Sequence, residues 1–417
     1  MRGHIRQRSE GSYEIRISIG RDPGTGKKKY QYETVRGTKR DAGQRLAELL
    51  HQRDTGYLVK PGKVTVAEFL RQWLNDYVVT RVRPVTAQGY VQKIERHIIP
   101  ALGGVPLADL KPGHLQSFYG KLLQGGRLDG PGGLSARTVL HMHRILHNAL
   151  SCAVKWGFAP RNVAEAVDPP RARAKEMKFL SPEGVSRLLE ASRDSIYYPL
   201  IHLAVYTGLR RSELLGLRWK DVDLDMATIS VVQVMHCLRG GKVIFQEPKS
   251  QRGKRQVALS PVAVLALRDH RARQEGTALL LGATLKPDDI LFSNPDLSPM
   301  LPNSVTHGFI KIVRRAGLGP VRLHDLRHTH ASLMLAQGVH PKIVSERLGH
   351  ATVSITLDTY SHVIPGLQEA AALTFERALG RADRHVTEKA AAPLTLTGAA
   401  EKEWQKSGKT GNAPKGD

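Results

Sequence analysis

The sequence predicts an α+β protein of several domains, mainly helical, with a small antiparallel sheet at each of two places. The chain has 417 residues, which is enough for two or three domains with cores of their own. Residues 12–19 and 30–35 alternate polar and apolar side chains as strands do, whereas apolar residues from position 65 repeat at helical steps of three and four. Strand-like runs return between residues 227 and 259 before the helical pattern resumes.

The first predicted domain, residues 1–58, is a small sheet followed by one helix. Turn residues at 22–26 separate the two strand-like runs, and Thr38 is the expected cap of a helix that carries Leu46 and Leu49. A fold of this size has little core, so one interpretation is a domain that only stabilises its neighbour. Its many lysines and arginines favour a DNA-reading β-ribbon.

The second predicted domain, residues 63–170, is helical throughout. Thr65 and Glu68 have the spacing of a capping box and open an amphipathic helix, and three more helices are expected at 86–99, 112–123 and 135–156. The Gly-rich stretch 125–133 is interpreted as a loop, because no strand precedes it as a phosphate-binding loop would require. Basic residues 171–175 form the expected linker.

The third predicted domain, residues 176–380, is mostly helical around a small sheet. Ser181 and Pro182 open a helix that is expected to run to about Tyr206 and to break at Gly208. A second helical stretch at 212–217 precedes three strands at 227–235, 242–246 and 256–259, and helices return from Asn303. The Ala-, Thr-, Gly- and Lys-rich residues 381–417 are expected to be disordered.

The net charge of +24 favours a polyanionic partner. Basic residues outnumber acidic ones in each of the segments 1–60, 61–175 and 176–380. A ribosome-bound or membrane-surface protein could show this balance, but three successive basic domains fit a clamp along nucleic acid best.

Other features of the composition favour a cytoplasmic protein. No run approaches the roughly 18 to 20 apolar residues of a membrane span, and the N-terminus lacks the apolar stretch of a secretory signal. Cys152 and Cys237 are the only cysteines, which suits a reducing compartment and argues against a disulfide framework or a zinc site.

Six polar residues supply the groups that metal-free cleavage of a phosphodiester requires: a nucleophile, cations for the phosphate oxygens and groups that move protons. No single one is informative, because a lone arginine is usually a surface residue and the chain has eleven tyrosines. They are Arg210, Lys249, His324, Arg327, His350 and Tyr360.

The local context of these residues favours a common site. Arg210 follows the expected helix break, and His324 and Arg327 stand three apart at a helix start, so that both project from one face. Lys249 is expected where a strand ends and a tight basic turn, residues 249–255, begins. A flexible hairpin tip of this kind can bring a lysine into a groove, where it could act as general acid. His328 and His330 lie in the same helix, but no cysteine or carboxylate cluster supports a metal site there.

Three segments resemble the tyrosine recombinase family of phage-type integrases. Residues 207–214, Thr-Gly-Leu-Arg-Arg-Ser-Glu-Leu, resemble the first arginine box of this family, and residues 324–329, His-Asp-Leu-Arg-His-Thr, resemble the second. Residues 358–362, Asp-Thr-Tyr-Ser-His, are similar to the nucleophile segment. His330 departs from the usual aromatic or apolar residue at its position.

The resemblance implies a function and an architecture. Tyr360 would be the nucleophile, Arg210 and Arg327 the phosphate-holding cations, with Glu213 supporting Arg210. Lys249, His324 and His350 would complete the site, with no cofactor and no metal. The implied architecture is an arm-binding domain at 1–58, a core-binding domain at 63–170 and a catalytic domain at 176–380.

The implied partners are duplex DNA with core and arm attachment sites, three further protomers in a tetramer, and an accessory directionality factor, all in the bacterial cytoplasm. Two alternatives remain open at this stage. A DNA-binding regulator could keep the fold without the chemistry, and a type IB topoisomerase would share the chemistry but relax DNA without sequence preference.

Overall fold

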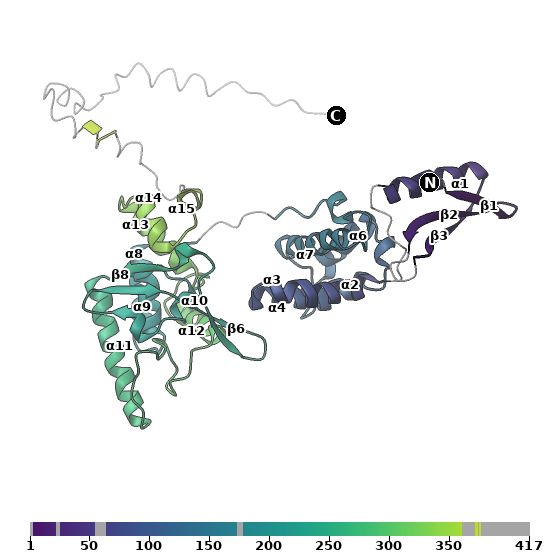
Figure 1. The fold of residues 1–417 in the computed structure, drawn as a ribbon. Coiled ribbons are helices and arrows are strands. Elements are labelled where there is room, and N and C mark those ends of the chain that lie inside the picture. Colours follow the sequence, from purple (N-terminus) through teal and green to yellow (C-terminus); the bar gives the residue numbers. More distant parts are fainter. Residues whose placement is uncertain are drawn as a thin grey trace, which may run out of the picture. The chain divides into compact units, whose positions relative to one another are not determined.

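The structure, a computed structural model, describes most of the chain in four long stretches (Figure 1). Two compact units, Met1–Thr329 and His330–Asp417, divide the molecule. No helix among the described residues is long and apolar enough to cross a membrane. The described residues are 3–21, 26–54, 64–172 and 178–360, with 372–373 and 375–376.

The N-terminal stretch forms a three-stranded antiparallel sheet with one helix packed on it. Ile15 and Ile17 alternate toward the helix and are buried together with Leu49, whereas Arg16 between them is exposed. Arg45 of the helix and Glu33 of the sheet form an ion pair at 2.7 Å. The sheet order is β1-β2-β3, and the elements are β1 His4–Ser9, β2 Ser12–Arg21, β3 Lys28–Arg36 and α1 Lys39–Asp54.

Strand β1 was not predicted from the sequence, whereas the other two strands and the helix were. Its residues, His-Ile-Arg-Gln-Arg-Ser, include one apolar side chain, Ile5, so no alternation is visible. An edge strand needs few apolar residues, because its backbone bonds to β2 hold it in place.

The second stretch is helical, as predicted. Thr65 and Glu68 form the expected capping box, with the Glu68 carboxylate accepting from the Thr65 backbone at 2.8 Å. Phe69 and Trp73 lie fully buried in a core of their own. The helices are α2 Val66–Trp73, α3 Val79–Arg81, α4 Pro84–Lys93, α5 Ile99–Leu102, α6 Pro112–Gly125 and α7 Ala136–Lys155, with π-helical turns at Leu74–Val78 and Ile94–Ile98.

The third stretch begins with two helices where the sequence analysis predicted one. Helix α8 spans Pro182–Ser192, and α9 spans Tyr198–Thr207. Between them the Ser195 hydroxyl accepts a hydrogen bond from the Tyr197 backbone, and Pro199 occupies the first turn of α9, where its missing N–H costs nothing. The prediction of a continuous helix to Tyr206 was therefore wrong.

The predicted strands form a long, interrupted hairpin. Strand β5 pairs with β8, and β6 pairs with β7. The predicted strand 227–235 is broken at residues 232–233, where the Gln233 side chain donates to the Gly216 carbonyl at 2.8 Å. The strands are β4 Val222–Asp223, β5 Thr228–Val231, β6 Val234–Cys237, β7 Val243–Gln246 and β8 Arg255–Ala258.

Helices complete the described chain. Those from Pro302 onward were predicted, whereas α11 was assigned no element from the sequence. They are α10 Arg211–Leu214, α11 Pro261–Leu280, α12 Pro302–Arg315, α13 Asp325–Ala336, α14 Pro341–Leu348 and α15 Val353–Tyr360. The predicted disordered tail, 381–417, lies outside the described residues, as does most of the linker at 171–175. The domain limits stay a prediction.

Candidate active site

Arg210 is placed by the end of one helix and the start of the next. Gly208 ends α9 in the left-handed conformation, with φ 65° and ψ 18°, which a residue without a β-carbon adopts most readily. The chain then enters α10 directly after Arg210, whose side chain remains 37% exposed. The break at Gly208 was predicted, and it leaves the Arg210 guanidinium accessible.

Glu213 orients Arg210 through hydrogen bonds to both its side chain and its backbone. Its carboxylate accepts hydrogen bonds from the Arg210 side chain at 2.7 Å and from the Arg210 backbone N–H at 2.9 Å. Burial acts to raise the pKa of Glu213, but the charges of Arg255 and Arg210 outweigh it and lower the pKa overall. Glu213 is therefore a buried anion that orients a cation.

Arg327 is joined to the segment that carries Arg210. It lies in the first turn of α13, is only 3% exposed, and donates from Nη1 to the Gly208 carbonyl at 3.0 Å. The carbonyl is available because Gly208 has left the helical hydrogen-bonding path. The two segments, more than a hundred positions apart in sequence, thus meet at one place.

Asp325 fixes the start of α13. It is 1% exposed and accepts hydrogen bonds from the Arg322 backbone at 2.8 Å and from the Arg322 guanidinium at 2.8 Å. Leu326 lies in the core at 0% exposure, which anchors the first turn. His324 and Arg327 are therefore presented by a rigid helix end.

His324 is a neutral imidazole at pH 7. Desolvation, His328, Arg327 and, to a smaller extent, Arg210 together lower its pKa to about 4, whereas Asp325 acts to raise it. The residue is exposed to solvent, which limits the desolvation, but the two arginines act in the same direction. His324, Arg327 and Arg210 consequently belong to one electrostatic site.

We expect the pKa of His324 to rise when a phosphodiester enters this site. The added anion offsets the positive charges that disfavour the imidazolium, so protonation becomes easier. Histidine-selective NMR titration of the free and DNA-bound chain measures both values, and His324→Asn identifies the resonance. A pKa that is unchanged or lower on DNA binding would contradict the placement of His324 beside the phosphate.

Lys249 follows the end of strand β7 at Gln246 and precedes a short turn, as predicted. The predicted hairpin between the two flanking strands is wrong, because β7 pairs with β6 and β8 pairs with β5. Lys249 lies in residues 247–254, which separate β7 from β8. We call residues 247–254 the lysine segment. Lys249 itself is exposed, whereas its neighbour Pro248 is buried.

The second compact unit carries His350 and Tyr360. Gly349 ends α14 in the left-handed conformation, and the His350 ring then forms a hydrogen bond with the Thr356 hydroxyl of α15 at 2.8 Å. Tyr360 is the last residue of α15 and is 1% exposed. His350 is thus fixed against the helix that bears the candidate nucleophile.

Two further residues, His330 and Arg255, form side-chain contacts near the candidate residues. His330, the departure from the family pattern, accepts a hydrogen bond from Arg347 at 3.1 Å. Arg255, which the sequence analysis did not single out, pairs with Glu213 at 3.0 Å. The signal for Arg255 was weak, because it is one of several basic residues in a turn, and only the fold shows which of them points inward.

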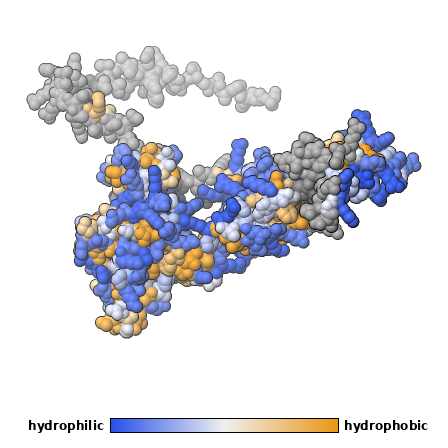
Figure 2. Space-filling view, in the orientation of Figure 1, coloured by the Kyte–Doolittle hydropathy of each residue, from blue (hydrophilic) through white to orange (hydrophobic). Residues whose placement is uncertain are grey.

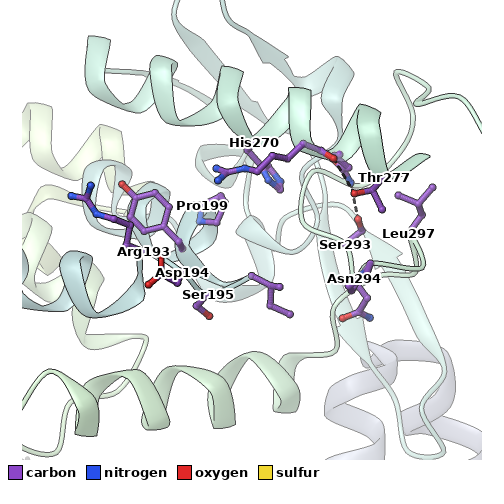
Figure 3. A pocket seen from close by; sticks show the side chains of 14 residues that line it. Arg193, Asp194, Ser195, Pro199, His270, Thr277, Ser293, Asn294 and Leu297 are labelled. Carbon is purple, nitrogen blue, oxygen red and sulfur yellow. Dashed lines mark hydrogen bonds between the residues drawn. The ribbon is translucent and has the colours of Figure 1, made fainter. Parts of the chain in front are cut away.

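A cavity elsewhere in the molecule contains none of the six candidate residues. It has a volume of about 470 Å³ and lies at the beginning of α9, the opposite end of this helix from Arg210 (Figure 3). His270 and Thr277 of α11 line it together with Ser195 and Asn294. Among the described residues, no group of three His, Cys, Asp or Glu side chains is placed to hold a metal ion.

Two family models match the chain. Residues 178–365 match the phage integrase family, and residues 65–123 match the N-terminal SAM-like domain of phage integrases. The first match spans the stretch that contains all six candidate residues. The second lies within the helical stretch.

Two curated relatives align with the chain over most of their length. A protein named tyrosine recombinase XerC-like, from Caldanaerobacter subterraneus subsp. tengcongensis, is 29% identical over 371 residues, covering 85% of this chain and 93% of the relative. The ICEBs1 integrase of Bacillus subtilis is 25% identical over 367 residues, covering 88% of this chain and 97% of the relative.

Solved structures share the fold. The Tn1549 transposon integrase, in complex with a circular intermediate DNA, matches with a TM-score of 0.61 at 21% identity, covering 76% of this chain and 99% of that one. A lambda integrase tetramer bound to a Holliday junction matches with a TM-score of 0.54 at 19% identity, covering 85% and 94%. On the two family models and the alignments over most of the length of these relatives, the chain belongs to the phage integrase family of tyrosine recombinases.

Proposed function

We propose that this chain is a site-specific DNA recombinase, the integrase of a mobile element, which cuts and rejoins duplex DNA through a 3′-phosphotyrosine intermediate. The observation that carries the proposal is the hydrogen bond from Arg327 to the Gly208 carbonyl. It joins the segments of the two candidate arginines, which supports a site in which both cations act on one phosphate. Family membership supplies the reaction class.

The proposed step forms one bond and breaks another. The Tyr360 oxygen attacks phosphorus, and the bond from phosphorus to the 5′ oxygen breaks, so phosphate stays on the 3′ end. Arg210 and Arg327 stabilise the charge that develops on the non-bridging oxygens. Lys249 gives its proton to the departing 5′ oxygen, while His324 and His350 assist removal of the Tyr360 hydroxyl proton and contact phosphate oxygens.

The covalent intermediate explains why no external energy source is required. A phosphodiester is exchanged for a phosphotyrosine ester and back, so the bond energy of the cut strand is kept. We infer that four protomers exchange strands pairwise between two duplexes, which accords with the lambda integrase tetramer seen on a Holliday junction. An accessory directionality factor is part of the proposal.

The helical stretch contains a basic cavity suited to a DNA phosphate. Lys93 of α4 and Arg144 of α7 line it with Arg137 and His141, and no carboxylate is among its described lining residues. Partial burial lowers the pKa of Lys93. Burial, then Lys93 and Arg144, also lower the pKa of His141. Like charges gathered in this way are relieved by an anion.

We expect Lys93→Gln and Arg144→Gln each to weaken binding of duplex DNA and to reduce the salt dependence of binding. The slope of log K against log salt is negative, and the loss of one phosphate contact reduces its magnitude by about one. Fluorescence anisotropy at several salt concentrations measures both quantities. Lys121→Gln, which removes an exposed charge from α6 of the same stretch, is the matched control and should leave the slope unchanged. Equal effects of all three variants would contradict a specific phosphate site.

The N-terminal sheet is proposed to bind the arm sites. Tyr32 is 57% exposed and Tyr30 38% exposed, and the Arg16 guanidinium lies 4.8 Å from the centre of the Tyr30 ring. Exposed aromatic and basic side chains on one sheet suit contact with bases and phosphates. Hydrophilic residues cover most of this sheet on the face seen in Figure 2.

Covalent selection from a random DNA library tests the proposed function and does not require a defined target site. The chain is incubated with a library of nicked duplexes of random sequence, protein–DNA adducts are recovered under denaturing conditions, and the attached strands are sequenced. We expect one enriched sequence class, linked through its 3′ phosphate and with a free 5′ hydroxyl. Recovery of no adduct would refute recombinase chemistry and favour a regulator, and adducts without sequence preference would favour a topoisomerase.

A further inference from the structure

The Glu213 carboxylate lies between two arginines rather than beside one. Arg210 donates to Oε1 at 2.7 Å from its side chain, and Arg255 donates to Oε2 at 3.0 Å and to Oε1 at 3.3 Å. The Glu213 side chain is 2% exposed and that of Arg255 is 7% exposed, whereas that of Arg210 is 37% exposed. Arg255 is therefore the buried partner of the pair, and Arg210 is the one that can meet a substrate.

Arg255 also holds the end of the lysine segment. It is the first residue of β8 and pairs with Val231 of β5. Its Nη1 donates a hydrogen bond to the Gly253 carbonyl at 3.2 Å. Gly253 is buried in the short helical turn Gln251–Gly253, which follows Lys249 by two residues. The Arg255 guanidinium thus contacts both the Glu213 carboxylate, which binds Arg210, and the Gly253 carbonyl, which follows Lys249 in the chain.

The geometry points to a role for Arg255 in the cleavage step: it is a positioning residue that fixes Arg210 through Glu213 and fixes Lys249 through the Gly253 carbonyl. The inference rests on the proposed function, because it assumes that Arg210 and Lys249 act on the same phosphodiester. Arg255 touches neither the substrate nor the reacting atoms in this scheme. Its effect is to keep Arg210, the phosphate-binding cation, and Lys249, the proton donor, at fixed positions relative to each other.

Arginine is required here for its shape. The planar fork reaches both carboxylate oxygens and still has a donor for a backbone carbonyl, whereas the ammonium of a lysine cannot span these acceptors in the same way. Arg255→Lys therefore keeps the charge that Glu213 needs but loses part of the geometry. The double variant Glu213→Gln, Arg255→Gln replaces the ion pair by an amide pair and leaves no buried charge unpaired.

The test compares two leaving groups on the nicked duplex recovered by covalent selection. In one substrate the 5′ leaving atom is oxygen, and in the other it is sulfur, which departs as a thiolate and does not need a proton donor. A variant that has lost proper placement of Lys249 is expected to recover on the sulfur substrate. A variant that has lost only phosphate binding is not expected to recover.

We expect Arg255→Lys to form covalent adducts about tenfold to a hundredfold more slowly than the parent chain on the oxygen substrate, with DNA affinity unchanged. On the sulfur substrate the rate difference from the parent chain should shrink by about tenfold, and hydrogen exchange of the lysine segment should be faster than in the parent. The double variant, checked for folding by circular dichroism, should show the same changes as Arg255→Lys. Arg218→Lys, which alters another arginine–carboxylate pair of the same stretch at 2.9 Å, is the matched control and should cleave normally.

Two outcomes would overturn the inference. Cleavage by Arg255→Lys within about twofold of the parent rate would show that its contacts do not position the site. An equal deficit on the oxygen and sulfur substrates would show that Arg255 does not act through Lys249. Failure of the proposed function itself is distinguishable, because then the parent chain forms no adduct, or Lys249→Ala is not recovered by sulfur.

Discussion

A Tyr360→Phe variant will bind the selected duplex as tightly as the parent chain and will form no covalent adduct with it. The substitution removes only the hydroxyl oxygen, which is the atom that attacks phosphorus in the proposed step. The loss should be complete within detection, because no other group in the scheme can form the ester. Denaturing gel electrophoresis of labelled duplex after incubation measures the adduct, and anisotropy measures binding.

Tyr119→Phe is the matched control for this experiment. Tyr119 is also buried, at 1% exposure, and its hydroxyl contacts the His143 ring at 3.0 Å in the helical stretch. Its replacement removes a buried hydroxyl of the same kind, and we expect it to leave adduct formation intact. Adducts formed by Tyr360→Phe would mean that another residue is the nucleophile, and peptide mapping of the adduct would identify it.

An Arg327→Lys variant will fold and bind DNA but will cleave about 10²- to 10³-fold more slowly, a loss of about 2.7 to 4 kcal/mol of transition-state stabilisation. Lysine keeps the positive charge of Arg327, so the loss of cleavage rate comes from the different geometry of its donors. In the parent chain, one donor of Arg327 is used by the Gly208 carbonyl and the rest of the fork stays oriented. A lysine that bonds this carbonyl has no rigid second donor for a phosphate oxygen.

Single-turnover adduct formation on the selected duplex measures this loss. Arg314→Lys, which alters an exposed arginine of α12 in the same compact unit, should leave the rate unchanged. A normal rate for Arg327→Lys would remove Arg327 from the site and with it the main argument for the proposed function. A variant that fails to bind DNA would point to an effect on folding, which circular dichroism detects.

The helical elements were predictable because their signals are local. The capping box at Thr65 and the turn at Gly208 are each specified by a few adjacent residues, and the structure has both. Helix α9 was not predicted as a separate element. Its start depends on a turn at Ser195 and on Pro199 in its first turn, and neither interrupts the run of apolar residues that suggested one continuous helix. Strand β1 was missed because strand pairing, not side-chain pattern, defines it.

The site was predictable in composition but not in geometry. Residue types and order indicated the six candidates, and the role of each stays a prediction. The contact between Arg327 and Gly208, the pairing of β7 with β6 and not with β8, and the ion pair between Arg255 and Glu213 depend on residues distant in sequence. Such contacts leave no periodic trace, because one side chain and one carbonyl are enough to make them.

Gly208 has a consequence for how members of this family are judged to be active or inactive. Its carbonyl accepts the hydrogen bond of Arg327 while the residue has a positive φ of 65°, a conformation that costs most other residues roughly 1 to 2 kcal/mol. A homologue with a branched residue at this position would retain every polar group of the reaction and still misdirect one of its arginines. An inventory of catalytic side chains would count that homologue as competent, although its defect lies in a main-chain oxygen.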